Sequence, residues 1–239
     1  MNVVGWLTCR YIFLNDTLVA PIFDSKNNET SRSVWVPPGD WEDAWDGSIV
    51  TGPKTVTTTQ PYERIPMWHN KNGGLIVTTD KPGLRIDDAD WSTLTLEAFP
   101  PRAGTAATTQ RLVVPRNGTF ADRTELSFST DVAGLVTLDV AAVTTTTFND
   151  DERAWAVRLH LFPGQRVTSV AVDGVPLSEG ETATETEFYH IAPVAAGSSA
   201  YFPLGGRGTA PAENAGHVAE FLLPAAALGI SRTVVARIE

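Results

Sequence analysis

Short runs of alternating apolar and polar residues, separated by Gly, Pro and Asp, are the sequence feature that most limits how this chain can fold. The clearest run is "WAVRLHLF", in which Val157, Leu159 and Leu161 alternate with polar residues. This alternation places the three aliphatic side chains on one face of a strand. Similar runs recur at a spacing of roughly 8–12 residues, which is typical of antiparallel sandwiches. The best helical stretch, "AEFLLPAAALGI", is interrupted by Pro224. The pattern predicts an all-β fold.

Turn signals divide the predicted strands. The sequence Pro37-Pro38-Gly39 is expected to end a short strand over Val34–Val36, because proline removes backbone donors. Residues 71–74, "KNGG", predict a hairpin-type turn between two short strands. Asp173-Gly174 predicts a type I′ hairpin turn.

A segment rich in Pro, Gly and Asp, "DKPGLRIDDAD" at residues 80–90, predicts a domain boundary. We therefore expect two antiparallel β-sandwich domains in tandem, over residues 15–86 and residues 87–239. Residues 1–14 do not have the pattern of a domain of their own.

Composition narrows the classes of partner. The chain has 239 residues and a formal net charge of −10, with 42% hydrophobic residues. An acidic globular chain is not expected to bind nucleic acid or an anionic membrane. The single cysteine, Cys9, allows no internal disulfide framework and is interpreted as a buried small residue. Three N-x-[ST] sequons, at Asn15, Asn28 and Asn117, slightly favour the secretory pathway, and the compartment is otherwise open.

The residue types that usually carry catalysis do not form a recognisable constellation. The four histidines lie outside metal-ligand spacing and are interpreted as structural; they are His69, His160, His190 and His217. The acidic run at Asp87, Asp88 and Asp90 lacks the glycine and distal glutamate of a calcium loop and is interpreted as a solvated linker. Glu42 and Asp43 are adjacent in a strand, so they point to opposite faces and do not flank one bond as paired glycosidase carboxylates do. We predict no catalytic, cofactor-binding or metal-binding residue, and no cofactor.

Tryptophans are concentrated near the N-terminus. Four of the seven lie between residues 35 and 68, namely Trp35, Trp41, Trp45 and Trp68. Two interpretations apply: these rings fill a sandwich core or interface, or they are exposed platforms on which a sugar stacks. We retain all four as candidate sugar-contact residues beside the core interpretation.

Three motifs in order carry a resemblance to a known family. They are "NDTLVAPIFD", "VWVPPGDWEDAWDG" and "RIPMWHNKNGG", followed by "WSTLTLEAFP". Together they resemble the C-terminal part of glycoside hydrolase family 31, the α-glucosidase and α-xylosidase family. The matching positions are Asp16, Leu18, Val19, Ala20, Pro21, Pro37, Gly39, Trp41, Asp43, Trp45, Gly47, Ile65, Pro66 and Gly73.

The resemblance implies a proximal β-sandwich at residues 15–86 and a distal one at residues 87–239, which in that family follow a catalytic (β/α)8 barrel. Residues 1–14 would then be a residual barrel end or a non-native start. The family's catalytic aspartates lie in the barrel, and its "W-x-D-M-N-E" nucleophile motif is absent here. The acidic "Y-E-D-D-G" stretch common in its distal domain is also absent.

This resemblance predicts an accessory β-module of a retaining α-glycosidase that is inactive alone. The implied partners are carbohydrate, through the parent enzyme, and a catalytic barrel that a separate chain could also supply. A free-standing carbohydrate-binding module and a protein-docking module are the alternatives. We also expect an exposed apolar patch around the N-terminal strand, where a barrel would pack.

Overall fold

The computed structural model describes residues 10–13, 16–22, 31–60, 64–79, 92–113, 123–143, 152–191 and 216–239. In these ranges every regular element is a strand, and the sheets are mostly antiparallel. The predicted all-β sandwich class is confirmed. None of the described residues forms a helix long and apolar enough to cross a membrane.

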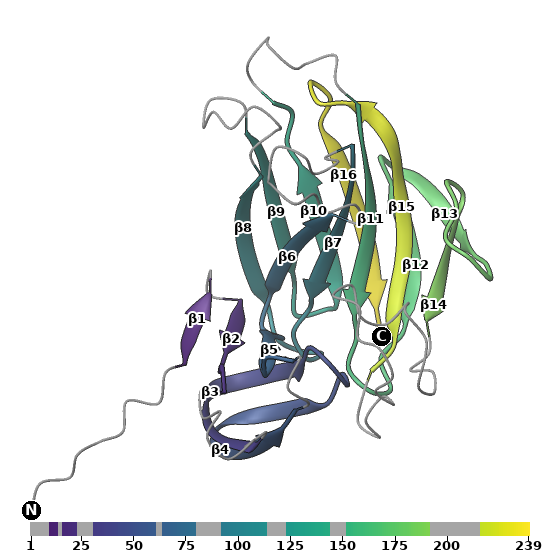
Figure 1. The fold of residues 1–239 in the computed structure, drawn as a ribbon. Helices are drawn as coiled ribbons and strands as arrows, with labels where there is room; N and C mark the ends of the chain where they lie inside the picture. Colours follow the sequence, from purple (N-terminus) through teal and green to yellow (C-terminus); the bar gives the residue numbers. More distant parts are fainter. Residues whose placement is uncertain are drawn as a thin grey trace, which may run out of the picture.

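A five-stranded sheet, which we call the first sheet, opens the chain (Figure 1, purple and blue). Its strand order is β1-β2-β5-β3-β4. The strands are β1 (Tyr11–Phe13), β2 (Thr17–Val19), β3 (Ser31–Asp43), β4 (Ile49–Thr59) and β5 (Met67–Asn70).

An eleven-stranded sheet, the second sheet, forms the rest of the molecule, in the order β6-β7-β11-β15-β14-β13-β12-β16-β10-β9-β8. Its first strands are β6 (Gly74–Thr79), β7 (Thr93–Phe99), β8 (Ala107–Val113), β9 (Thr124–Thr130), β10 (Leu135–Val140) and β11 (Glu152–His160). The others are β12 (Val167–Val172), β13 (Val175–Glu179), β14 (Glu187–Ile191), β15 (Val218–Ala227) and β16 (Arg232–Ile238).

The second sheet folds back on itself into two layers (Figure 1). One layer holds β6, β7, β11, β15 and β14, and the other holds β12, β16, β10, β9 and β8. The layers are joined by a parallel pairing of β13 with β14, and β7 and β11 are also parallel. One hydrophobic cluster lies between them, with Leu96, Phe128 and Phe221 among its buried members. This is the arrangement expected of strands with one apolar face each.

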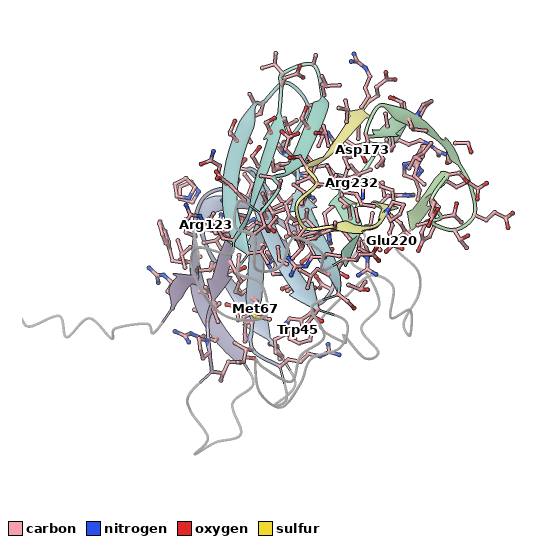
Figure 2. All side chains as sticks on the ribbon, turned by 90° about the horizontal axis from the view of Figure 1, so that it is seen from above. Trp45, Met67, Arg123, Asp173, Glu220 and Arg232 are labelled. Atoms are coloured by element: carbon pink, nitrogen blue, oxygen red, sulfur yellow. The ribbon has the colours of Figure 1, made fainter. Side chains whose placement is uncertain are left out.

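Strand alternation is confirmed along β11. Val157 and Leu159 are buried in the common core, as the sequence predicts. Leu94, Leu96 and Ala98 of β7 are likewise buried. Figure 2 draws the side chains on the ribbon and labels Arg232, at the start of β16, which donates to Asp173 directly after β12.

The prediction that Pro37-Pro38-Gly39 ends a strand is wrong. β3 continues through these residues, and its pairing with β4 shifts register between Val36 and Gly39. The bulge takes up the prolines, whose missing N–H groups are tolerated at such an irregularity. Gly39 has a φ of +110° and lies opposite Gly52. A Cβ on Gly52 would stand 1.9 Å from the Pro37 carbonyl oxygen, so the crossing needs glycine there.

The turn predicted at residues 71–74 is present, but it does not form a hairpin. β5 pairs with β2 and β3, whereas β6 pairs with β7 in the second sheet. The turn therefore carries the chain from one sheet to the other. The second sheet begins at Gly74, which lies within the first predicted domain, residues 15–86.

Two other sequence signals are resolved by the pairing. β12 and β13 form the predicted hairpin, and Asp173 (φ +50°) and Gly174 (φ +81°) have the positive φ angles of a type I′ turn. Pro224, which interrupts the candidate helix, lies within strand β15. The partner β11 shifts register between Arg153 and Trp155, and this irregularity accommodates the proline.

The first sheet has its own small core. Buried Leu18, Val34, Val36, Trp41 and Trp68 pack together with Ala20. The prediction of an exposed apolar patch around the N-terminal strand is wrong for β2, because its three residues are all buried. Ile12 in β1 is exposed.

Candidate functional site

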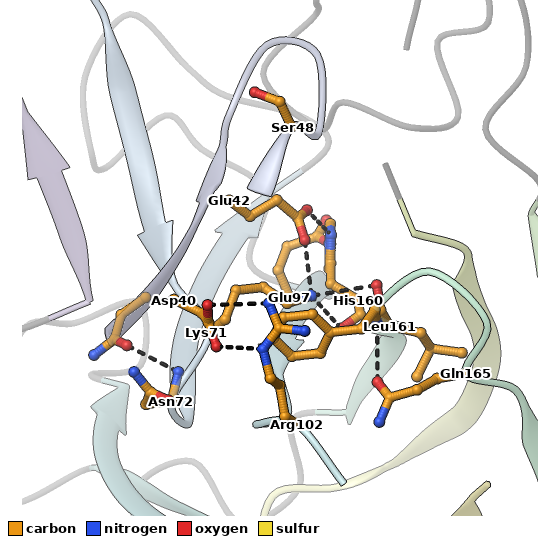
Figure 3. A network of polar contacts seen from close by, with 12 residues as sticks. Asp40, Glu42, Ser48, Lys71, Asn72, Glu97, Arg102, His160, Leu161 and Gln165 are labelled. Atoms are coloured by element: carbon orange, nitrogen blue, oxygen red, sulfur yellow. Dashed lines mark hydrogen bonds and ion pairs between the residues drawn. The ribbon is translucent and has the colours of Figure 1, made fainter. Parts of the chain in front are cut away.

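A buried cluster of charged side chains lies where the first sheet meets the second, and we call it the charged junction (Figure 3). It comprises Glu42, Lys71, Glu97 and His160, all of which are buried. Ionised side chains are rarely fully buried unless they are paired. Four of them in one place make this the most distinctive chemical feature of the described chain.

Each residue of the junction comes from a different element. Glu42 lies near the end of β3, and Lys71 lies in the turn that links the two sheets. Glu97 and His160 lie on neighbouring parallel strands, β7 and β11. On β11, His160 follows the buried Leu159 and so points away from the sandwich core, toward the first sheet.

Lys71 satisfies all three of its donors inside the junction. Its Nζ lies 2.8 Å from Glu42 Oε2 and 2.7 Å from the His160 carbonyl oxygen, with the Leu161 carbonyl oxygen at 3.4 Å. The side chain has no solvent exposure. The ammonium group also lies 4.6 Å from the centre of the Phe162 ring, which adds a cation–π contact. One lysine therefore ties β3 to the end of β11.

His160 bridges two carboxylates. Its Nδ1 lies 2.7 Å from Glu42 Oε1, and its Nε2 lies 2.6 Å from Glu97 Oε2. The ring also stacks on Phe99, with 4.3 Å between ring centres. Because each ring nitrogen faces a carboxylate oxygen, both nitrogens act as donors, and this requires the protonated imidazolium.

The chain of ion pairs continues beyond Glu97. Arg158 Nη1 lies 3.2 Å from Glu97 Oε1, and Arg158 Nε pairs with Glu220 on β15. Charges of opposite sign therefore alternate along the row Lys71, Glu42, His160, Glu97, Arg158 and Glu220. The row has three cations and three anions, so it carries no formal net charge.

The pKa values follow from this alternation. Burial alone would raise the pKa of Glu42, but Lys71 and His160 outweigh it and lower the pKa to about 2. Burial would lower the pKa of His160, but Glu42 and Glu97 raise it to about 9. Burial lowers the pKa of Lys71, and Glu42 opposes that shift. At neutral pH, Glu42 is a carboxylate and His160 an imidazolium.

Two further ion pairs join the sheets around the junction. Asp40 of β3 accepts from Arg102, with Nε to Oδ2 at 2.7 Å. Asp16, next to β2, pairs with Arg111 of β8. In both pairs the first sheet supplies the carboxylate and the second sheet supplies the cation, as Glu42 and His160 do in the junction. This complementarity fixes how one sheet sits on the other.

The chemistry of the junction is structural. A general acid or base needs a pKa near the working pH and access to substrate. Glu42 and Glu97 are buried and held by cations, so neither has a free oxygen face for a substrate. The pKa of the buried Asp43 carboxyl rises to about 7, because of burial and the nearby Asp46. Its Oδ1 accepts from the Trp45 backbone N–H, which makes it part of the turn after β3.

The four candidate tryptophans separate into two groups. Trp41, Trp45 and Trp68 are buried, and Trp41 and Trp68 belong to the first-sheet core. The indole N–H of Trp41 donates to the Pro37 carbonyl, and that of Trp45 donates to the Ile65 carbonyl. Trp35 is 40% exposed, and it is the ring of the four that solvent or a ligand reaches.

The other residues singled out in the sequence are the acidic run, the sequon asparagines, Cys9 and the histidines. Asp87, Asp88 and Asp90, the sequon residues Asn15, Asn28 and Asn117, and Cys9 lie outside the described residues. Within the described ranges, no group of three or more His, Cys, Asp or Glu is placed to hold a metal ion. His69 contacts Thr17 Oγ1, and His190 Nε2 accepts from the Val167 N–H. Both bonds fit the structural interpretation of these histidines.

The junction itself could not be read from the sequence. Polar residues alternating with aliphatic ones on β7 and β11 indicate an outer sheet face, which is normally solvated. Here the first sheet covers that face, so Glu97 and His160 become buried. The available signal was the coincidence of charged residues of both signs at outward positions of adjacent strands.

Comparison with known proteins agrees with this architecture. Residues 6–76 match the family described as the glycosyl hydrolase family 31 C-terminal domain. An isomaltosyltransferase of Sporosarcina globispora is 34% identical over 67 residues, which are 28% of this chain and 6% of that protein.

Solved structures extend the likeness to nearly the whole chain. The cycloalternan-forming enzyme of Listeria monocytogenes, in complex with a pentasaccharide substrate, has a TM-score of 0.63 and 20% identity. The match covers 95% of this chain and 18% of that one. A dextranase of Flavobacterium johnsoniae has a TM-score of 0.61 and 12% identity, covering 95% of this chain and 26% of that one. The TM-scores show a shared fold, and the chain spans a small part of each relative.

Proposed function

We propose, from the membership of residues 6–76 in the C-terminal domain of glycosyl hydrolase family 31, that this chain is the supporting β-module of an enzyme acting on α-glycosidic bonds. The module would have no hydrolytic activity alone. Support comes from the three relatives named above, which are described as an isomaltosyltransferase, a cycloalternan-forming enzyme and a dextranase. All three names concern transfer or cleavage of sugar units.

The observation that carries the proposal is that the two junction carboxylates, Glu42 and Glu97, are buried and paired with cations. A retaining glycosidase needs two carboxyl groups about 5–5.5 Å apart that both reach the sugar. Glu42 and Glu97 are instead joined through one imidazolium and have side-chain exposures of 4% and 2%. They hold two sheets together, which is what a supporting module requires.

The proposal assigns a role to each part of the chain. Residues 15–86 would correspond to the proximal sandwich and residues 87–239 to the distal sandwich, with β6 contributed by the first segment to the second sheet. A catalytic (β/α)8 barrel, in the same polypeptide or in a separate chain, would be the partner. Carbohydrate would be bound through the complete enzyme.

The test is a turnover assay on the purified chain. With p-nitrophenyl α-glucoside and with isomaltose we expect no release of product above the buffer rate, while an authentic α-glucosidase in parallel releases it. Glu42→Gln and Glu97→Gln variants serve as controls for chain-borne catalysis. Turnover by the natural chain that either variant lowers would refute the supporting role.

A second candidate function, carbohydrate binding by this chain itself, is favoured by the exposed ring of Trp35. Exposed tryptophan is a common platform for a sugar ring, because the indole combines a large apolar face with a polar edge.

A further inference from the structure

The outward face of β3 and β4 has a regular row of hydroxyl groups beside an exposed indole. Three cross-strand pairs make it up, namely Ser31 with Thr59, Ser33 with Thr57, and Trp35 with Thr55. We call these six residues the hydroxyl ladder. All six are exposed. Ser31 Oγ lies 2.6 Å from Thr59 Oγ1, and Ser33 Oγ lies 3.5 Å from Thr57 Oγ1.

The opposite face of the same two strands already supplies the packing of the first sheet. Val34 and Val36 are buried in its core, with Val56 packed against them. The hydroxyl ladder therefore has no role in that core. The indole of Trp35 on this outward face leaves apolar ring surface in contact with water, and a stacked ligand would cover it.

Trp35 stays accessible in its surroundings. The guanidinium of Arg10 lies 5.2 Å from the ring centre, and the side chain is still 40% exposed with that cation in place. The guanidinium lies over one face of the ring and brings hydrogen-bond donors close to it, and the other face is left for a stacked ligand. The ladder thus offers an aromatic surface, a bordering donor group and a row of hydroxyls.

The chemistry of the face selects the class of ligand. None of the six residues is charged, and the chain as a whole has a net charge of −10, so a polyanion is disfavoured. Hydroxyl groups both donate and accept hydrogen bonds, and they match a neutral partner that carries many hydroxyls of its own. From Ser31 to Trp35 the strand rises about 14 Å, which is the length of a short oligosaccharide.

We propose that the hydroxyl ladder binds a segment of neutral α-glucan, with one sugar ring stacked on Trp35 and the following rings along the Ser and Thr hydroxyls. This inference rests on the proposed function, since it names the ligand that a supporting module of a glucan-active enzyme would hold. The contact would keep the polysaccharide near the enzyme while other parts of the protein act on it.

Titration calorimetry of the purified full chain with maltoheptaose and with soluble dextran tests the proposal. We expect saturable binding heat, with a dissociation constant in the millimolar range, for at least one glucan. Trp35→Ala should weaken binding at least about tenfold, and Trp35→Tyr should keep most of it because a ring remains. Thr57→Val, which removes a hydroxyl without changing the shape of the side chain, should weaken binding several-fold.

The matched control is Thr168→Val, which removes an exposed threonine hydroxyl on β12 of the second sheet. It should bind as the natural chain does. Absence of heat with both glucans would overturn the proposal, as would unchanged binding in Trp35→Ala and Thr57→Val together. Neither result bears on the turnover assay, so this proposal and the supporting role can fail separately.

Discussion

At the scale of single residues, His160 shows how an ordinary strand position acquires a special environment. The sequence places it on the outward face of β11, and there it meets carboxylates from two other strands, Glu42 and Glu97. An isolated imidazolium so deeply buried would lose its proton. The two carboxylates reverse that tendency and raise the pKa to about 9.

A raised pKa makes the contribution of His160 depend on pH in a definite direction. The native value of about 9 lies above the ordinary value of 6.5. The stabilisation is therefore complete below about pH 6.5 and is lost as the pH rises through 9. The pKa difference corresponds to roughly 3 kcal/mol.

Urea unfolding of the natural chain and of His160→Gln at pH 6 and pH 10 measures this effect. The difference in unfolding free energy between the two proteins should shrink by a few kcal/mol at the higher pH. His217→Gln, at an exposed histidine, should follow the natural chain at both values. An equal difference at pH 6 and pH 10 would show that His160 is neutral in the native protein.

At the scale of elements, β3 and the turn after β5 depart most from what the sequence predicts. Pro37 and Pro38 are reliable signs of a strand end when local chemistry decides, but pairing with β4 on both sides carries β3 through them. The sequence correctly predicts a turn at residues 71–74, but the predicted hairpin is absent, because β5 and β6 pair with strands of different sheets. Local sequence specifies a bend, whereas the sheet that each flanking strand joins depends on contacts distant in sequence.

The bulge in β3 predicts that Gly52 is sensitive to substitution. In Gly52→Ala, the added Cβ would meet the Pro37 carbonyl carbon and oxygen, which are backbone atoms that cannot rotate away. We expect a loss of about 1–3 kcal/mol in unfolding free energy, as for overpacking elsewhere. Thr55→Ala, at an exposed position three residues along β4, is the control and should change stability by less than about 0.5 kcal/mol. Equal stability of the two variants would mean that the strands separate at the bulge at little cost.

At the scale of the whole molecule, the sequence predicted much of the fold and little of the junction. The alternation in β7, β11 and β12 and the Asp173-Gly174 turn were sufficient for the sandwich. Three of the four tryptophans serve as core, one of the two interpretations left open. The burial of Glu97 and His160 depends on the first sheet covering the second, and no pattern within either strand records that covering.

The charged junction joins two sheets that have separate hydrophobic cores, and we expect it to make them open as one unit. Lys71 is the key residue, because it is in the link between the sheets and bonds to both of them. Removing one partner of a buried ion pair leaves the other charge uncompensated, which commonly costs about 3–5 kcal/mol. The pair Arg166–Glu179, which is largely exposed, offers a comparison expected to be worth at most about 1 kcal/mol.

Native-state hydrogen exchange compared between the natural chain, Lys71→Met and Arg166→Met tests this claim most directly. In the natural chain and in Arg166→Met, the amides of β3 and β5 should exchange with the same opening free energy as those of β7 and β11. In Lys71→Met, the first-sheet amides should exchange several kcal/mol more easily than the second-sheet amides. If the first sheet already opens independently in the natural chain, or if Lys71→Met leaves the two sheets coupled, the junction is not what joins them.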